Sequence, residues 1–221
     1  MKYHVVVDLE MCKIPKGLRT KEYHWSEETI QIGAVLMDEN YEFVDKFNTY
    51  VSPRMGKLDS FITRLTGINV GDVINAPDME EALKRFTDWM PKEDVEIVSW
   101  SDNDQRQIQR EMEGKHIDNS RMAELLENWN DCQVTFGVKM NNNRRYSLSE
   151  ALIATGIYPE GKEHDGYYDA YNTALLFRKL ELEEELQLCE EYKTARSDEK
   201  KELTFSLGDL FKNLDLQLCA G

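Results

Sequence analysis

The sequence predicts an α/β fold, and three observations support that prediction. Short runs rich in β-branched residues, such as 5–7, alternate along the chain with longer segments in which apolar residues recur at helical spacing. About 41% of the 221 residues are apolar, which suffices for a sizeable core. No run is long enough to cross a membrane, and residues 1–10 lack the features of a signal peptide. We therefore expect one α/β domain with an appendage.

The order of the expected elements follows from these patterns. Strands are expected over residues 3–9, 29–38, 41–51 and 95–100, with a hairpin turn at 38–40. Helices are expected over residues 76–90, 102–113, 120–129, 147–157 and 167–192. The helix at 147 has a capping box, because Ser147 is followed three residues later by Glu150. After about Arg196 we expect a solvated linker over 197–202 and a short apolar tail element over 203–218.

Charge and cysteine content narrow the function classes. The chain has 27 basic and 42 acidic residues, a net charge of −15, which repels polyanions at long range. Binding to nucleic acid must therefore depend on a local site. A loop over 13–27 concentrates basic charge at Lys13, Lys16, Arg19 and Lys21, and Arg144 and Arg145 are a second candidate for basic contacts. For both sets, solvated surface charge is the slightly favoured explanation. The four cysteines are far apart, which predicts neither a zinc knuckle nor a disulfide framework and favours a reduced, cytoplasmic protein.

The first expected strand ends with two carboxylates on one face. Residues two apart in a strand share a face, so Asp8 and Glu10 project side by side while Val7 and Leu9 face the other way. Two adjacent buried carboxylates repel, and each is costly to desolvate. A divalent cation such as Mg²⁺ or Mn²⁺ removes both problems. The alternative is a strand end whose acids reach solvent.

Two further acids are expected to face inward from helices. Asp104 shares a helical stripe with Ile108 and Met112, whereas Asp102 lies off it and suits a helix N-cap. Asp169 begins a stripe that continues through Asn172, Thr173, Leu176 and Leu180. The alternative for Asp104 is a favourable first-turn acid, which would be the favoured explanation for that residue taken alone.

Four inward carboxylates and one histidine suggest hydrolytic chemistry. His164 lies five residues before Asp169, before or at the start of the helix, where a plain loop residue is the alternative. Two divalent ions held by four acids can clamp an in-line phosphoryl displacement. A histidine with a near-neutral pKa can remove the proton of the attacking water.

These motifs resemble the DEDDh 3′–5′ exonucleases of the ribonuclease H-like fold, most closely the RNA-trimming branch. The Asp-x-Glu motif is "DLE", the second family acid falls on Asp104 of "WSDND", and His-x4-Asp is "HDGYYD". The segments "ITRLTGI" and "YSLSEALIATGI" resemble two more family landmarks in the family order. Ser101 replaces the usual Gly before the second acid, which could shift the backbone there.

The resemblance implies a fold and a set of roles. It implies a mixed five-stranded sheet flanked by helices and an exonuclease domain over 1–180. The C-terminal helical extension and tail expected over 181–221 have no counterpart in the family. The resemblance implies that His164 is the general base. It also implies that two Mg²⁺ ions, with Mn²⁺ as substitute, are bound by four acids: Asp8, Glu10, Asp104 and Asp169. It further implies that four residues contact the terminal nucleoside: Met11, Ile62, Leu65 and Thr66. For Ile62 and Leu65, a place in the apolar core of a helix is an equally good interpretation.

The expected function is metal-dependent hydrolysis of single-stranded RNA or DNA from the 3′ end, releasing nucleoside 5′-monophosphates. RNA is favoured by the resemblance, and no membrane partner is expected. Two alternatives stay open: a non-catalytic regulatory or interaction protein of the same fold, and a scavenger of very short oligoribonucleotides. A degenerate member normally lacks an acid or the histidine, and all five are present here.

Overall fold

The computed structural model describes residues 2–141 and 144–193. The chain divides into two compact units, Met1–Gln187 and Leu188–Gly221, and the first contains the sheet and all of the candidate site residues. The predicted tail elements over 197–202 and 203–218 lie outside the described residues. The functional division into 1–180 and 181–221 stays a prediction.

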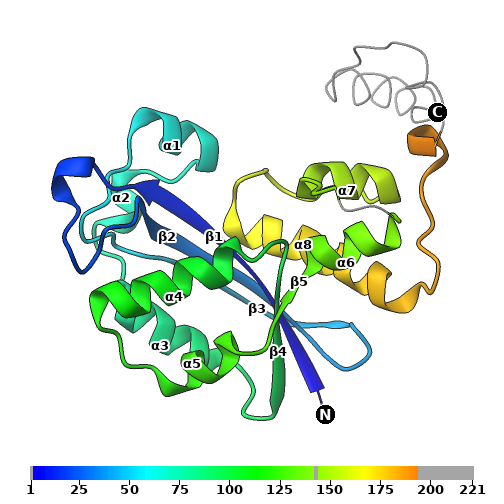
Figure 1. The fold of residues 1–221 in the computed structure, drawn as a ribbon, viewed down its shortest axis with the longest axis horizontal. Helices are drawn as coiled ribbons and strands as arrows, with labels where there is room; N and C mark the ends of the chain where they lie inside the picture. The colour runs from blue at the N-terminus through cyan, green and yellow to red at the C-terminus, as the bar shows by residue number, and fades with distance from the viewer. Residues whose placement is uncertain (1, 142–143, 194–221) are drawn as a thin grey trace. The chain divides into compact units, whose positions relative to one another are not determined.

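A five-stranded mixed sheet forms the centre of the first unit (Figure 1). Its strands are β1 Lys2–Lys13, β2 Glu27–Met37, β3 Phe43–Tyr50, β4 Asp94–Ser99 and β5 Trp129–Asp131. They lie in the order β3-β2-β1-β4-β5, with β1 antiparallel to β2 and parallel to β4. The sheet order and the mixed pairing confirm the predicted fold class.

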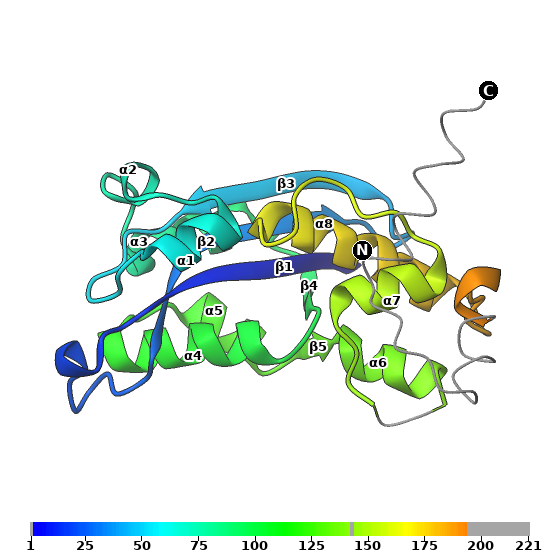
Figure 2. The same cartoon turned by 90° about the horizontal axis from the view of Figure 1, so that it is seen from above.

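Helices cover both faces of this sheet. They are α1 Ser60–Thr66, α2 Val70–Val73, α3 Met79–Trp89, α4 Asn103–Lys115, α5 Ser120–Leu126, α6 Cys132–Lys139, α7 Leu148–Thr155 and α8 Gly166–Leu182, with a 3-10 turn η1 at Lys16–Leu18. Helix α8 lies against β1 and β2 in both views (Figures 1 and 2). In the described part of the chain, no helix has the length and apolar composition needed to cross a bilayer.

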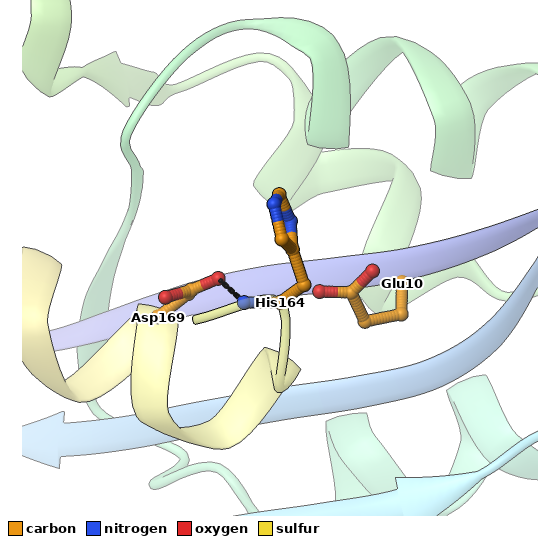
Figure 3. Close-up of side chains that lie close together, drawn as sticks. All are labelled: Glu10, His164 and Asp169. Carbon is orange, nitrogen blue, oxygen red and sulfur yellow. Dashed lines mark hydrogen bonds between the residues drawn. The ribbon is translucent and has the colours of Figure 1, made fainter. Parts of the chain in front are cut away.

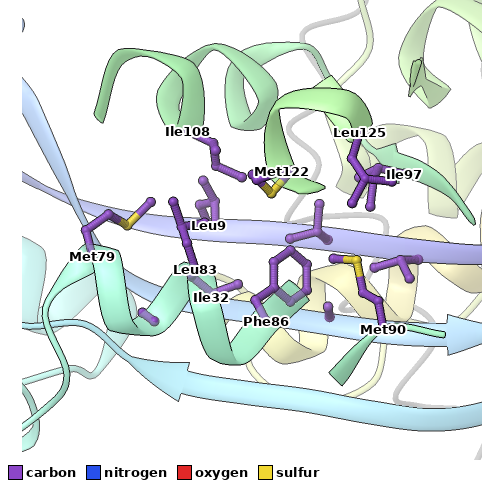
Figure 4. Close-up of a cluster of buried hydrophobic side chains, with 14 of the residues drawn as sticks. Leu9, Ile32, Met79, Leu83, Phe86, Met90, Ile97, Ile108, Met122 and Leu125 are labelled. Atoms are coloured by element: carbon purple, nitrogen blue, oxygen red, sulfur yellow. The ribbon is translucent and has the colours of Figure 1, made fainter. Parts of the chain in front are cut away.

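The main core explains which face of β1 is left for polar groups. Val5, Val7 and Leu9 are buried together with apolar side chains of α3, α4 and α5 (Figure 4). Successive strand residues point to opposite faces, so Asp8 and Glu10 face away from this core. The same alternation on β2 places Ile32 and Ala34 in the core and leaves Gly33 on the side of the acids.

Two expected helices need correction, and three short helices were not expected. The helix predicted over 167–192 ends at Leu182, and Glu183 is extended. Acids at 181 and 183–185 place like charges at the negative end of the helix dipole, which favours termination there. The helix predicted over 120–129 ends at Leu126, because the following residues pair with β4 as β5. The short helices α1, α2 and α6 were not predicted from the chain's periodicity.

Candidate active site

The strand β1 supplies two acids at the point where its pairing becomes irregular. Asp8 is partly buried opposite Gly33 of β2, and Glu10 is 8% exposed opposite Gln31. The β1–β2 register shifts immediately after Glu10, as at a β-bulge. Bulges of this kind re-aim side chains and are common beside active sites.

Asp104 reaches β1 from the start of α4. The pairing of β4 with β1 extends to Val6, so the backbone N–H of Leu9 lies beyond it. That N–H donates to Oδ1 of Asp104 at 3.0 Å, and the Asp104 side chain is buried. The inward orientation predicted for Asp104 is therefore confirmed, and Ser101 does not displace it.

Asp102 occupies the N-cap of α4, as the sequence predicted, but its side chain makes no capping hydrogen bond. Its carboxylate pairs with Arg106 one turn along the helix. The two nearby acids thus have different surroundings: Asp104 contacts the sheet, and Asp102 contacts its own helix.

The start of α8 is pressed directly onto the sheet. A Cβ placed on Gly33 would lie 2.1 Å from the carbonyl carbon of Gly166, so only glycine permits this approach. Gly166 in turn lies against the backbone oxygen of Asp8. This contact brings the first turn of α8, which carries Asp169, beside the acids of β1.

His164 lies just before that turn in a left-handed conformation, with φ of 64°. Its backbone N–H donates to Oδ2 of Asp169 at 2.9 Å (Figure 3). Potential ligand atoms of Glu10, His164 and Asp169 all lie within 4.8 Å of one another. The side chains shown in Figure 3 therefore come from a strand, a loop and a helix but meet at one place.

The positive charges and hydrogen-bond donors around the site acids do not offset the effects of burial and mutual repulsion on their pKa values. Burial, together with repulsion from Asp169 and Asp104, raises the pKa of Glu10 to about 8. Burial raises the pKa of Asp104 to about 7 and that of Asp169 to about 6, although N–H donors oppose the rise. The pKa of Asp8 lies well above its usual range because of burial and then repulsion from Asp104 and Asp169.

A divalent cation fits this arrangement. Four carboxylates that repel one another in a poorly solvated place offer hard oxygen ligands, and a bound cation would favour their ionised forms. Lys162 lowers the pKa of Glu10, but this contribution is smaller than those of burial and the neighbouring acids.

The four residues expected to contact the terminal nucleoside differ in burial and in their neighbours. Ile62 is buried in a cluster with Cys12, Ile30, Ile68 and Val73, which matches the helix-core interpretation. The buried hydroxyl of Thr66 donates to the Ile62 carbonyl and accepts from the Ile68 N–H, so it already has local partners. Leu65 is partly exposed, and Met11 packs beside the main core. Their contact with substrate stays a prediction.

Sequence reasoning missed two polar residues near the acids. Gln31 accepts a hydrogen bond from the Gly166 N–H at the start of α8. The sequence pattern that could have indicated Gln31 is a polar residue between the apolar Ile30 and Ile32 of a predicted strand. Lys162 is exposed in the segment before His164, and its Nζ lies 3.5 Å from the Arg64 carbonyl at α1. No local pattern marks Lys162.

Comparisons with known proteins agree with this geometry. A family model described as "Exonuclease" (RNase_T) matches residues 5–177. The chain is 31% identical over 177 residues to ERI1 exoribonuclease 2 of Danio rerio, covering 70% of this chain and 31% of that protein. It therefore spans less than a third of that curated relative.

Solved structures show the same fold. The nuclease domain of 3'hExo, described as a DEDDh family member bound to rAMP, matches with a TM-score of 0.64 and 21% identity, covering 85% of this chain and 96% of that one. Cell-death related nuclease 4 (CRN-4) matches with a TM-score of 0.69 and 17% identity, covering 92% and 72%. The exonuclease family predicted from the sequence is confirmed: this chain belongs to the exonuclease (RNase_T) family, and an ERI1 exoribonuclease is among its relatives.

Proposed function

We propose that the chain removes nucleotides from the 3′ end of single-stranded nucleic acid, with RNA favoured, and releases nucleoside 5′-monophosphates. The observation that supports this best is the convergence of Asp8, Glu10, Asp104 and Asp169, whose raised pKa values indicate acids in need of a cation. The exoribonuclease name of the relative and the rAMP of the 3'hExo structure support the choice of RNA.

The residues would divide the work as follows. The four carboxylates would hold two Mg²⁺, or Mn²⁺ in their place, and these ions supply Lewis-acid stabilisation of the phosphoryl transition state. An imidazole nitrogen of His164 would take the proton of the attacking water. The N–H of His164 donates to Asp169 and so couples the position of the base to that of a ligand.

The test uses RNA and DNA strands labelled at either the 3′ or the 5′ end, with Mg²⁺, Mn²⁺ or excess chelator. We expect a ladder of 5′-labelled products, early release of the 3′ label as mononucleotide, and no reaction with chelator. Full activity in chelator would reject the two-metal proposal. His164→Ala should lower turnover by roughly 10²–10⁴-fold and leave calorimetric Mn²⁺ binding largely intact.

We propose short or frayed single strands as the preferred substrate. A chain of net charge −15 is poorly suited to grip a duplex through many phosphates. The dependence of binding on salt should therefore be shallow, because each neutralised single-strand phosphate contributes only about −0.7 to the slope. A binding series with Asp169→Asn measures this, and a preference for blunt duplex would contradict it.

The two alternatives predict different outcomes in the same assay. A scavenger of very short oligoribonucleotides would lose activity as the strand lengthens beyond a few nucleotides. A non-catalytic regulatory protein would bind without cleaving under any metal condition. A cytoplasmic location is part of the proposal and rests on the absence of any expected disulfide framework.

A further inference from the structure

Gln31 joins the sheet to the segment that carries the general base. It lies on β2 directly opposite Glu10 of β1, and only 1% of it is exposed. Its Oε1 accepts a hydrogen bond from the Gly166 N–H at 3.0 Å. Its Nε2 donates to Oδ1 of Asn48 at 3.0 Å and to Oδ1 of Asp165 at 3.3 Å. The amide is thus used at both ends, as both donor and acceptor.

Two of the three partners of Gln31, Asp165 and Gly166, are the residues that follow His164. Asp165 also caps α8, because its Oδ1 accepts from the N–H groups of Tyr167 and Tyr168. Gly166 is the first residue of the helix, and its N–H is buried against the sheet. Fixing Asp165 and Gly166 therefore fixes the point from which both the His164 loop and the first turn of α8 depart.

His164 needs such support because its backbone is unfavourable. A residue other than glycine with φ of 64° persists only where the surrounding structure holds it. On one side of this residue, the N–H of His164 bonds Asp169. On the other side, Gln31 holds the next two residues against the strand that pairs with Glu10. The place of the imidazole relative to the acids thus depends on Gln31.

We propose that Gln31 is a positioning residue for the hydrolysis and acts through His164. This inference rests on the proposed function, since it assigns a role within that reaction. A misplacement of about 1 Å caused by a residue away from the chemistry can lower a rate by about 10²-fold. Loss of the Gln31 amide should therefore lower kcat by about that factor, with a much smaller change in KM.

The experiment compares four variants of the full chain in the RNA assay. Gln31→Leu removes donor and acceptor together, whereas Gln31→Glu keeps the shape and the acceptor but sets a carboxylate against Asp165. Asn48→Ala removes only the partner furthest from α8 and should change kcat less than threefold. Gln107→Leu is the matched control, because Gln107 is also buried and bonds Glu111 and the Glu27 carbonyl away from His164.

The decisive measurement is a double-mutant cycle with His164→Ala. If Gln31 acts through the imidazole, Gln31→Leu should lower kcat by about 10²-fold in the natural background and by less than threefold in the His164→Ala background. Calorimetric Mn²⁺ stoichiometry corrects each kcat for the folded fraction. Gln107→Leu should lower the unfolding temperature and leave the corrected kcat near the unsubstituted value.

Two outcomes would overturn the inference. One is an unchanged corrected kcat in Gln31→Leu. The other is an equal loss in both backgrounds, which would show that Gln31 does not act through His164. Absence of metal-dependent hydrolysis in the unsubstituted chain would instead reject the proposed function, so the two failures are distinguishable.

Discussion

Within residues 2–141 and 144–193, two clusters of buried acids differ in whether a basic side chain of the protein lies beside them. Glu28 and Glu111 are fully buried, and the Lys115 ammonium lies 2.8 Å from the first and 2.5 Å from the second. Glu28 also accepts backbone N–H groups of the 54–56 segment, and Glu111 accepts the N–H of Thr29 and the amide of Gln107.

The pKa shifts of Glu28 and Glu10 have opposite signs. Burial alone would raise the pKa of Glu28, but the charge and hydrogen bonds of Lys115, with the N–H donors, bring it below its usual range. Burial and mutual repulsion raise the pKa of Glu10 to about 8 instead. A buried acid whose partner is built into the chain serves the fold, whereas a group of buried acids that repel one another points to a cation from outside. Four predictions follow from this difference.

The largest effect is expected on catalysis. Asp104→Asn or Asp169→Asn should lower hydrolysis by at least about 10³-fold, because metal-bound oxygens supply several kcal/mol of transition-state stabilisation. The same variants should be at least as stable as the unsubstituted chain in chelator, since a repelling charge is gone. Product release and thermal unfolding measure the two effects, and a strongly destabilised Asp169→Asn would contradict the comparison.

The compensated cluster should respond in the opposite way. Lys115→Met leaves two buried carboxylates without a cation and should destabilise the protein by about 3–5 kcal/mol in urea unfolding. Adding Glu28→Gln and Glu111→Gln should restore much of that loss. The matched control is Lys84→Met, whose ion pair with Asp88 is exposed and should contribute at most about 1 kcal/mol. An equal effect of both lysine variants would remove the distinction between buried and exposed pairs.

A smaller effect is expected from pH. Acids whose pKa is raised in the folded chain hold protons that the unfolded chain has released. In chelator, stability should therefore fall as pH rises from about 4.5 to about 8, the unfolded and folded values for Glu10. Each unit of pKa difference corresponds to about 1.4 kcal/mol. Saturating Mn²⁺ should flatten this slope in thermal unfolding, and a slope that metal does not change would contradict the assignment.

The smallest effect is expected at Asp102. Asp102→Asn removes the ion pair with Arg106, whose side chain is 54% exposed, and should cost less than about 1 kcal/mol. Hydrolysis should stay within about twofold of the unsubstituted rate. A loss comparable to that of Asp104→Asn would move the second acid of the site by two residues.

Local patterns in the sequence were sufficient to predict which face of its strand or helix carries each acid. Strand alternation placed Asp8 and Glu10 on one face, and the helical stripe through Ile108 separated Asp104 from Asp102. These predictions needed only the spacing of neighbouring residues. The mixed five-stranded sheet was expected from the family resemblance and was not available from periodicity.

Other features depend on contacts between distant segments. The pairing of Gln31 with Gly166 joins residues 135 positions apart, and no local pattern encodes it. The ion pairs of Glu28 and Glu111 with Lys115 form only when β2 and α4 meet, so the sequence could not show which buried acids have a lysine beside them. The three-residue strand β5 forms because it pairs with the free edge of β4. The helical pattern over 120–129 led to a helix prediction for part of it.

The seating of α8 on Gly33 also governs when the chain can act during its synthesis. Asp8, Glu10 and Asp104 leave the ribosome first, but His164 and Asp169 come only with the loop and helix that complete the sheet's second face. A nascent or truncated chain that ends before His164 holds three of the four acids and lacks both Asp169 and the proposed general base. Under the proposed function, the order of the elements along the chain would therefore leave partly made molecules without a complete site.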